Sequence, residues 1–120
     1  MKINEIQNFF KNLFFNKNKV VITKKVKSWD EIPKGYTGIA EHANGTKYWY
    51  LNGKLHREDG PAYERANGTK FWYLNDKLHR IDGPACEYPN GDKEYLINGK
   101  EVTKEAQEVL YAMYKLKGML

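Results

Sequence analysis

A period of 23 residues governs the middle of the chain and constrains its fold more than any other feature. The stretch NGTKYWYLNGKLHREDGPA, residues 44–62, recurs as NGTKFWYLNDKLHRIDGPA at residues 67–85, and a shorter third copy begins at residue 90. A unit of this length cannot bury a hydrophobic face alone, so successive units are expected to stack on one another. The degenerate ends of the first and third units are typical of a capped array.

Each unit carries two turn signals between alternating apolar residues. The first signal is Asn-Gly at 44–45, 67–68 and 90–91; the second is Asn52-Gly53, Asn75-Asp76 and Asn98-Gly99. Asn-Gly between such strands favours a type I′ turn, which needs positive φ at both central residues. In the middle unit this predicts strands over 61–65, 69–74 and 77–80. Over the three units it predicts an antiparallel meander of about eight or nine strands.

The segments on either side of the repeats lack the 23-residue pattern and have sequence patterns of their own. Residues 1–35 form a basic segment, with an amphipathic helix predicted over 3–15, a strand over 20–26 and a capping-box turn over 28–31. Residues 36–102 form the sheet. Residues 103–120 are predicted to be a helix with Thr103 as its N-cap. The expected fold is therefore mainly β (α+β): three 23-residue hairpin repeats flanked by an N-terminal and a C-terminal helix, in one compact domain.

The C-terminal helix is expected to cover sheet surface or a sheet end. Its mainly apolar stripe consists of Ala106, Val109, Leu110, Met113, Tyr114 and Lys117.

Strict alternation along the strands separates two faces of the sheet. The predicted core face carries Trp49, Leu51, Trp72, Leu74, Tyr95 and Ile97. The opposite face carries Tyr48, Tyr50, Phe71 and Tyr73. These aromatic residues have two interpretations: they pack under a terminal helix, or they form a contact patch, because such side chains anchor protein interfaces.

The positive charge lies mainly at the start of the chain. Of the net charge of +5, residues 1–27 carry seven lysines against one glutamate, whereas residues 28–101 carry ten basic and twelve acidic side chains. The candidate contacts for nucleic acid or for an acidic protein surface are Lys17, Lys19, Lys24, Lys25 and Lys27. The alternative is a solvated surface without a partner.

The composition argues against several site types. The single cysteine, Cys86, excludes an internal disulfide and suits a reducing cytosol. Polar residues interrupt the apolar start of the chain, so no leader or spanning helix is expected and the predicted location is the cytoplasm of a bacterial host cell. The spacing of His42, His56 and His79 does not suit zinc. No metal site, cofactor or Gly-rich phosphate loop is expected.

The repeated sequence His-Arg-x-Asp-Gly-Pro, at 56–61 and 79–84, invites a catalytic reading, since His and Asp are common partners in proton transfer. The pair occurs twice, however, and no nucleophile recurs beside it. Asp-Gly-Pro is also ordinary bend chemistry. We therefore expect a structural role and no catalytic residues.

The aromatic-x-x-Asn-Gly-Lys hairpin at this period resembles the MORN-type repeats of bacteria, in the form seen in small phage and prophage proteins. The resemblance covers about residues 36–103 and rests on Trp49, Trp72, Asn52-Gly53 and Asn98-Gly99; Asn75-Asp76 departs from it. It implies a sheet of successive hairpins that serves as a binding scaffold, without catalytic residues or cofactor.

Three functional hypotheses follow. The first is a non-enzymatic module that binds a protein or nucleoprotein. Its most concrete form is a phage-derived inhibitor of a bacterial defence complex, of the anti-CRISPR type, that occludes an effector or its nucleic-acid channel. The second is a direct nucleic-acid binder that uses the N-terminal lysines, with an antitoxin or structural repeat protein as a further alternative. The third is a hydrolase that uses His56 or His79.

Overall fold

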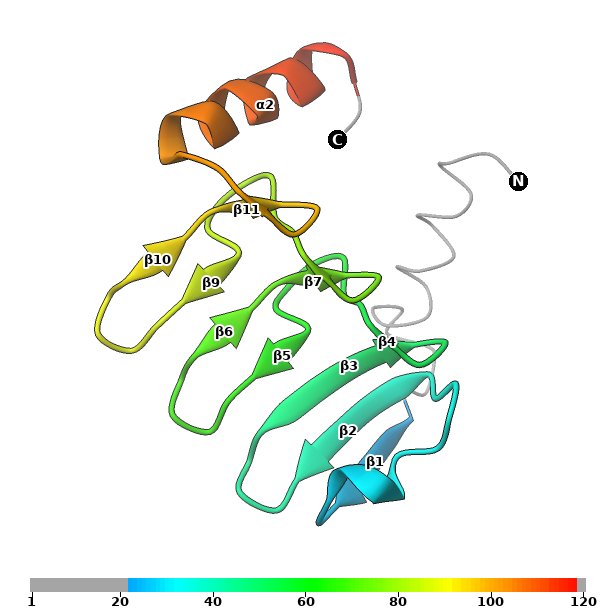
Figure 1. The fold of residues 1–120 in the computed structure, drawn as a ribbon. Coiled ribbons are helices and arrows are strands. Elements are labelled where there is room, and N and C mark those ends of the chain that lie inside the picture. The colour runs from blue at the N-terminus through cyan, green and yellow to red at the C-terminus, as the bar shows by residue number, and fades with distance from the viewer. Residues whose placement is uncertain (1–21, 119–120) are drawn as a thin grey trace.

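The computed structural model describes residues 22–118, and it is mainly β (Figure 1). The strands are β1 (Thr23–Val26), β2 (Gly38–His42), β3 (Lys47–Leu51), β4 (Lys54–Leu55), β5 (Tyr63–Glu64), β6 (Lys70–Phe71), β7 (Tyr73–Leu74), β8 (Lys77–Leu78), β9 (Cys86–Glu87), β10 (Lys93–Glu94), β11 (Leu96–Ile97) and β12 (Lys100–Glu101). A 3₁₀ turn, η1 (Trp29–Glu31), follows β1, and helix α2 (Lys104–Leu116) follows β12.

One mixed sheet runs through the whole array, in the order β1-β2-β3-β5-β6-β9-β10, with β4 paired to β3. The pairs β7–β8 and β11–β12 form separate two-stranded hairpins beside it (Figure 1). From β2 onward every pair is antiparallel, as the turn signals predicted, but β1 lies parallel to β2. The predicted helix over 3–15 and the first residues of the predicted strand 20–26 lie outside the described residues.

The strands are shorter than predicted, because the chain changes pairing partner at the repeated tryptophan. Trp72 donates its backbone N–H to Ala85 O at 2.8 Å in one direction and accepts from His79 N at 2.9 Å in the other. The predicted strand 69–74 is therefore split into β6, which belongs to the main sheet, and β7, which pairs with β8. Alternation alone does not reveal this break.

The two turn signals of each unit make different turns. At Asn52-Gly53, Asn75-Asp76 and Asn98-Gly99 both central residues have positive φ, as a type I′ turn requires. At the first signal, Asn-Gly at 44–45, 67–68 and 90–91, only the glycine has a positive φ. The prediction of a type I′ turn is therefore wrong at this signal. His42 N donates to Thr46 O and Gly45 N donates to His42 O, which leaves a three-residue loop with a left-handed glycine. The extra residue before each asparagine, such as Ala43, explains the difference.

Alternating charges cross the main sheet on directly opposed residues. The register pairs Lys25 with Glu41, Glu41 with Lys47, Lys47 with Glu64, Glu64 with Lys70, Lys70 with Glu87 and Glu87 with Lys93. Each opposed pair has opposite sign, and such cross-strand pairs contribute roughly 0.2–1 kcal/mol each relative to alanine pairs. This row agrees with the register that the buried faces and the turns set, because a slip of one residue would remove every charge from its directly opposed partner.

Both faces of the sheet are partly buried, and the predicted core face is buried only in part. Trp49, Leu51 and Ala62 form one core cluster, and Val26, Ala40 and Tyr48 form another on the opposite face. Trp72, Leu74, Tyr95 and Ile97, predicted to be core, are only half-buried. The reason is that a single-layered sheet receives cover from short segments on each side. Trp29 lies 4.5 Å from Tyr48 between ring centroids on one side, and the bends lie on the other.

The 3₁₀ turn η1 does not form the predicted capping box. The Ser28 side chain makes no capping hydrogen bond; the Glu31 N–H donates to the Ser28 backbone carbonyl instead, at 3.3 Å. The Glu31 carboxylate does reach back, but it accepts from Lys27 N at 3.2 Å.

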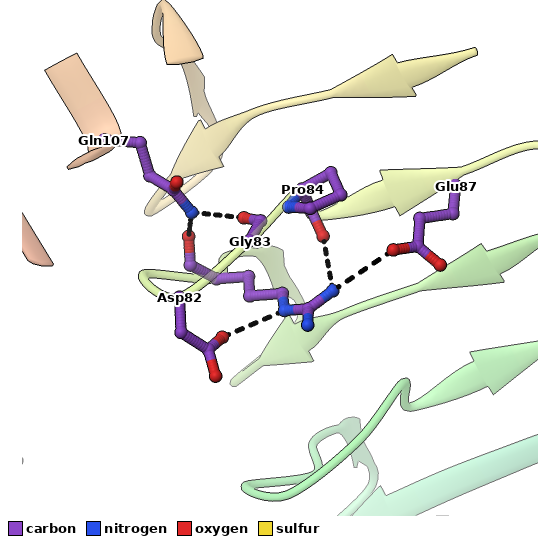
Figure 2. Close-up of polar contacts among 6 residues, drawn as sticks. Asp82, Gly83, Pro84, Glu87 and Gln107 are labelled. Carbon is purple, nitrogen blue, oxygen red and sulfur yellow. Dashed lines mark hydrogen bonds and ion pairs between the residues drawn. The ribbon is translucent and has the colours of Figure 1, made fainter. Parts of the chain in front are cut away.

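Helix α2 docks through one buried polar residue, Gln107, while Leu110 and Tyr114 of the predicted apolar stripe are half-buried. Its N-cap is confirmed, since Thr103 Oγ1 accepts from Ala106 N at 3.0 Å. Gln107 is 3% exposed, and its Nε2 donates to Arg80 O at 3.1 Å and to Gly83 O (Figure 2). Val109 and Met113, from the predicted stripe, are exposed. The backbone carbonyls of Arg80 and Gly83 in the last bend take their donor from Gln107, and this contact determines which side of the helix faces the repeats.

Replacing Gln107 with alanine should lower the free energy of unfolding by about 1–2 kcal/mol, because two backbone carbonyls would lose their donor. Chemical denaturation followed by tryptophan fluorescence measures this change. Lys104→Ala, at an exposed position of the same helix, is the control and should leave the midpoint within the experimental error. Equal midpoints for the two variants would contradict the docking role of Gln107.

Candidate functional site

The repeated His-Arg-x-Asp-Gly-Pro sequence builds an arginine clamp in both copies. The Arg80 guanidinium lies 4.0 Å from the centroid of the Trp72 ring. Its Nε donates to Asp82 Oδ1 at 2.9 Å, and its Nη1 donates to Pro84 O at 3.1 Å and lies 3.4 Å from Glu87 Oε1 (Figure 2). A planar guanidinium with several fixed donors suits this role, and lysine could not replace it.

Arg57 repeats the arrangement one unit earlier. It lies 4.2 Å from the Trp49 centroid, 3.1 Å from Asp59 Oδ1 and 3.1 Å from Pro61 O. The glycine of each copy leaves room for the guanidinium: a Cβ on Gly83 would lie 2.7 Å from Arg80 Cζ, so the arginine would have to move out of the clamp. The conserved spacing within the two copies therefore encodes a bend that is closed around an arginine.

The histidine of each copy joins one unit to the next. His56 Nδ1 accepts from the backbone N–H of Asn75 at 3.0 Å, and His79 Nδ1 accepts from that of Asn98 at 2.9 Å. The neighbouring turn residue adds a second bond in each case, from Asp76 N to Leu55 O and from Gly99 N to Leu78 O. We call these paired bonds the turn latch.

The first unit has a turn latch as well, although no histidine precedes it. Asn52 N donates to Thr37 Oγ1 at 2.9 Å, and Gly53 N donates to Tyr36 O at 2.8 Å. The latch also explains why Asp76 replaces the expected glycine: its carboxylate accepts from Leu55 N at 2.6 Å.

The two histidines differ in their second ring nitrogen. His56 Nε2 lies 2.9 Å from Glu58 Oε1, whereas Ile81 stands at the position of Glu58 in the next unit. His79 Nε2 consequently has no hydrogen-bond partner among the described residues. Since Nδ1 accepts a backbone N–H, the proton of neutral His79 is on Nε2. Burial lowers the pKa of His79, and the negative charge of Glu58 opposes that shift.

An open groove lies between the two bends and helix α2. Its volume is about 610 Å³. Aromatic and apolar side chains from separate parts of the chain line it, together with charged residues of both bends: Trp72, Leu74, Ile81, Tyr111 and Tyr114, with Arg57, Glu58, Asp59, His79, Arg80 and Asp82. The groove is thus a place where His79 and half-buried aromatic side chains are available to a ligand. Sequence reasoning missed Tyr111 as a lining residue, because its interpretation of the helix rested on a different stripe.

The four residues of the predicted aromatic patch, Tyr48, Tyr50, Phe71 and Tyr73, do not lie on one surface in the structure. Tyr48 and Phe71 both flank Tyr63 across the sheet, with centroid distances of 4.6 and 5.2 Å. Tyr50 lies near Tyr48 at 6.3 Å, but Tyr73 follows the strand break and packs against the Trp49 cluster instead.

Four residues that the sequence reasoning did not select extend this aromatic row. Trp29 and Tyr88 lie at its two ends, Tyr63 lies within it, and Arg65 stands over the rings of Tyr63 and Phe71. Tyr63 lies in the predicted strand 61–65 and is directly opposed to Tyr48 in the structure; its place in that strand was a signal that could have identified it. No terminal helix covers the row within residues 22–118; η1 lies over its Tyr48 end.

Burial makes the inner members of this row poor candidates for a contact. Tyr48 is 5% exposed, and burial, followed by a hydrogen bond with Tyr63, raises its pKa. Cys86 is buried nearby, and burial, with the charge of Glu94, raises the pKa of its thiol to about 11. A thiol with so high a pKa is a poor nucleophile at neutral pH.

The candidate lysines do not form one surface in the part of the chain that is described. Lys24 and Lys25 are neighbours on β1, so their side chains point to opposite faces of the sheet. Lys27 lies beyond the strand and is exposed. Lys17 and Lys19 lie outside the described residues.

Comparisons with other proteins add no assignment. No protein-family model, no curated protein and no solved structure matches this chain. The resemblance to MORN-type repeats accordingly stays an expectation from the sequence. Among residues 22–118, no three His, Cys, Asp or Glu side chains are grouped so that they could hold a metal ion. The same residues include no helix that is long and apolar enough to cross a membrane.

Replacing Asp82 with alanine should lower the free energy of unfolding by about 1 kcal/mol, because Arg80 loses the acceptor that orients it. Asp59→Ala should have an effect of similar size, since Arg57 makes the equivalent bond. Thermal unfolding followed by circular dichroism measures both. Unchanged melting temperatures would contradict the clamp.

Lowering the pH should destabilise the fold through His79. Its folded-state pKa lies below the ordinary value of about 6.5, so the unfolded chain binds the extra proton more readily. Stability due to this group is complete above that value and is lost as the pH falls below it towards the folded-state pKa. His79→Gln, whose side-chain oxygen can also accept from Asn98 N, should show a smaller decrease in melting temperature between pH 7 and pH 5. Identical decreases would contradict this origin.

Proposed function

We propose that this chain is a non-enzymatic binding module and that its partner, a protein or nucleoprotein, contacts the groove between the bends and α2. The observation that carries the proposal is the convergence of Trp72, Tyr111 and Tyr114 on one open cavity. Aromatic side chains in such a position are typical anchors of protein interfaces. A cavity of about 610 Å³ accommodates several side chains of a docked segment.

The chemistry of the motif supports a role without catalysis. A general base needs a free lone pair directed at the substrate. The Nδ1 lone pair of His79 accepts a backbone N–H, and its Nε2 carries the proton. The neighbouring arginine and aspartate bond to each other. These groups act as parts of the repeat rather than as a proton-transfer pair.

The geometry favours a protein partner over naked nucleic acid. The carboxylates of Glu58, Asp59 and Asp82 line the groove beside its two arginines, whereas a strand-tracking groove is uniformly positive. The described lysines of β1 face opposite ways, so they do not supply such a surface either. The narrower hypothesis is the inhibition of a bacterial defence complex, such as a CRISPR effector. It rests on the phage-like character of the repeats and remains a proposal.

Affinity capture from the bacterial host, followed by titration of the purified partner, tests the proposal. The double variant Tyr111→Ala/Tyr114→Ala should weaken the partner's affinity at least about tenfold, because two aromatic anchors are removed. Tyr88→Ala is the matched control, since Tyr88 packs on Phe71 and does not line the groove.

Equal loss in the double variant and in the control would contradict the groove as the contact. Binding to naked RNA or DNA with a steep dependence on salt would instead favour the nucleic-acid hypothesis.

A further inference from the structure

Strand β10 ends the main sheet and leaves one edge of it unpaired among residues 22–118. It is the last strand in the sheet order, and Figure 1 shows it at the end of the array. Asp92 O and Glu94 O accept from the residues that flank β9, so the backbone groups of Lys93 between them point to the opposite side. The N–H of Tyr95 also has no acceptor in the described part of the chain. We call Lys93 N–H, Lys93 C=O and Tyr95 N–H the free edge.

The preceding unit shows what such an edge binds. Its equivalent groups belong to Lys70 and Trp72, and they are covered by the strand of the next unit. Lys70 is directly opposed to Glu87, and Trp72 N donates to Ala85 O at 2.8 Å. Ala85 is fully buried, as Ala62 is one unit earlier, so a small residue suits this position. The free edge lies 23 residues further along and presents the same backbone groups to an extended antiparallel segment.

The side chains of β10 select the charges of that segment. Directly opposed residues of the charge row have opposite sign at every step, and the row ends on Lys93, which faces no residue on its open side. An acidic residue is complementary there. On the other face of the sheet, Glu94 stands where the earlier units have the aromatic rings of Tyr48 and Phe71. Glu94 makes no ion pair among residues 22–118, so a basic residue is complementary to it.

The same charges argue against a second copy of this chain as the occupant. Two β10 edges paired about Lys93 would oppose two lysines. Pairing with the outer edge of β1 would place Lys93 opposite Lys25, with which the charge row begins. Like charges directly opposite each other are destabilising. A lysine on a short edge strand protects that edge against such contacts, and it leaves the edge open to a segment of complementary charge.

We propose that the free edge binds an extended segment of a protein partner by strand addition, and that this segment has the order small residue, basic residue, acidic residue. The acidic residue exchanges two backbone hydrogen bonds with Lys93, and the carbonyl of the small residue accepts from Tyr95 N–H. Main-chain bonds supply the affinity in this mode, and alternate side chains supply the specificity.

This surface is separate from the site of the proposed function. Lys93, Glu94 and Tyr95 do not line the groove. Helix α2 leaves the free edge unpaired, since Gln107 bonds to the last bend at Arg80 O and Gly83 O.

A synthetic peptide, acetyl-Gly-Pro-Ala-Lys-Glu-Tyr-amide, tests the proposal in an NMR titration of the isotope-labelled full chain. It has the sequence of residues 83–88 with lysine in place of the cysteine. The amide signals of Lys93 and Tyr95 should shift most. Replacing the glutamate of the peptide with lysine should weaken its affinity at least about threefold, because like charges then oppose each other. Lys93→Glu should reverse this preference between the two peptides, whereas Lys100→Glu, on β12, should bind like the wild type.

Backbone methylation of the peptide separates strand addition from simple charge attraction. A methyl group on the glutamate nitrogen should abolish binding, because it removes the N–H that donates to Lys93 O. The matched control is a methyl group on the lysine nitrogen of the peptide, whose N–H points away from the free edge. This second peptide should keep its affinity within the experimental error.

Two results would overturn the proposal. The first is the absence of shifts at Lys93 and Tyr95 at the highest peptide concentration, whether residues 1–21 or a second copy covers the edge. The second is an equal loss of affinity in both methylated peptides. The peptide series uses the wild-type protein, so it does not depend on the folding of any variant. Tyr111→Ala/Tyr114→Ala should bind the peptide like the wild type, which distinguishes failure at the groove from failure at the free edge.

Discussion

The turn latch is the interaction on which the rest of the structure depends. The second Asn turn of each unit, at residues 52–53, 75–76 and 98–99, donates two backbone N–H groups to the segment before it. The acceptors are Tyr36-Thr37, Leu55-His56 and Leu78-His79 respectively. A two-stranded hairpin is marginal by itself in water. The small hairpins β7–β8 and β11–β12 therefore owe their stability to the unit that accepts from them, and the bends, the groove and the position of α2 follow from this stacking.

Much of this architecture was predictable, because it repeats. The 23-residue spacing, the hairpins at the Asn turns and the Thr103 N-cap are local signals, and the structure agrees with them. The bend role of the repeated motif was also predictable from Asp-Gly-Pro, but the roles of its first two residues were not. That Arg80 stacks on Trp72 and His79 accepts from Asn98 depends on contacts 8 and 19 residues away in the chain. No local propensity encodes contacts over such distances.

The site was harder to predict than the fold, and for a related reason. Apolar spacing on α2 suggested a face that would pack inward, yet Gln107 determines the orientation because the last bend leaves carbonyls to be satisfied. In the third unit Val102 stands in place of the histidine, and helix α2 begins two residues later, so no further Asn turn follows to form a latch in the described part of the chain. Helix α2 takes the place of a further unit, and the groove is a result of this termination. Its lining thus combines repeated residues with residues that occur once.

The charge row has a consequence for the evolution of such chains. Each unit contributes one glutamate and one lysine to it, as Glu64 and Lys70 do in the second unit and Glu87 and Lys93 in the third. Duplication or deletion of a whole unit would leave every charge opposite its complement. The number of repeat units can then vary under selection while the cross-strand charges stay paired. Related proteins with more or fewer units would need no compensating substitutions where two units join.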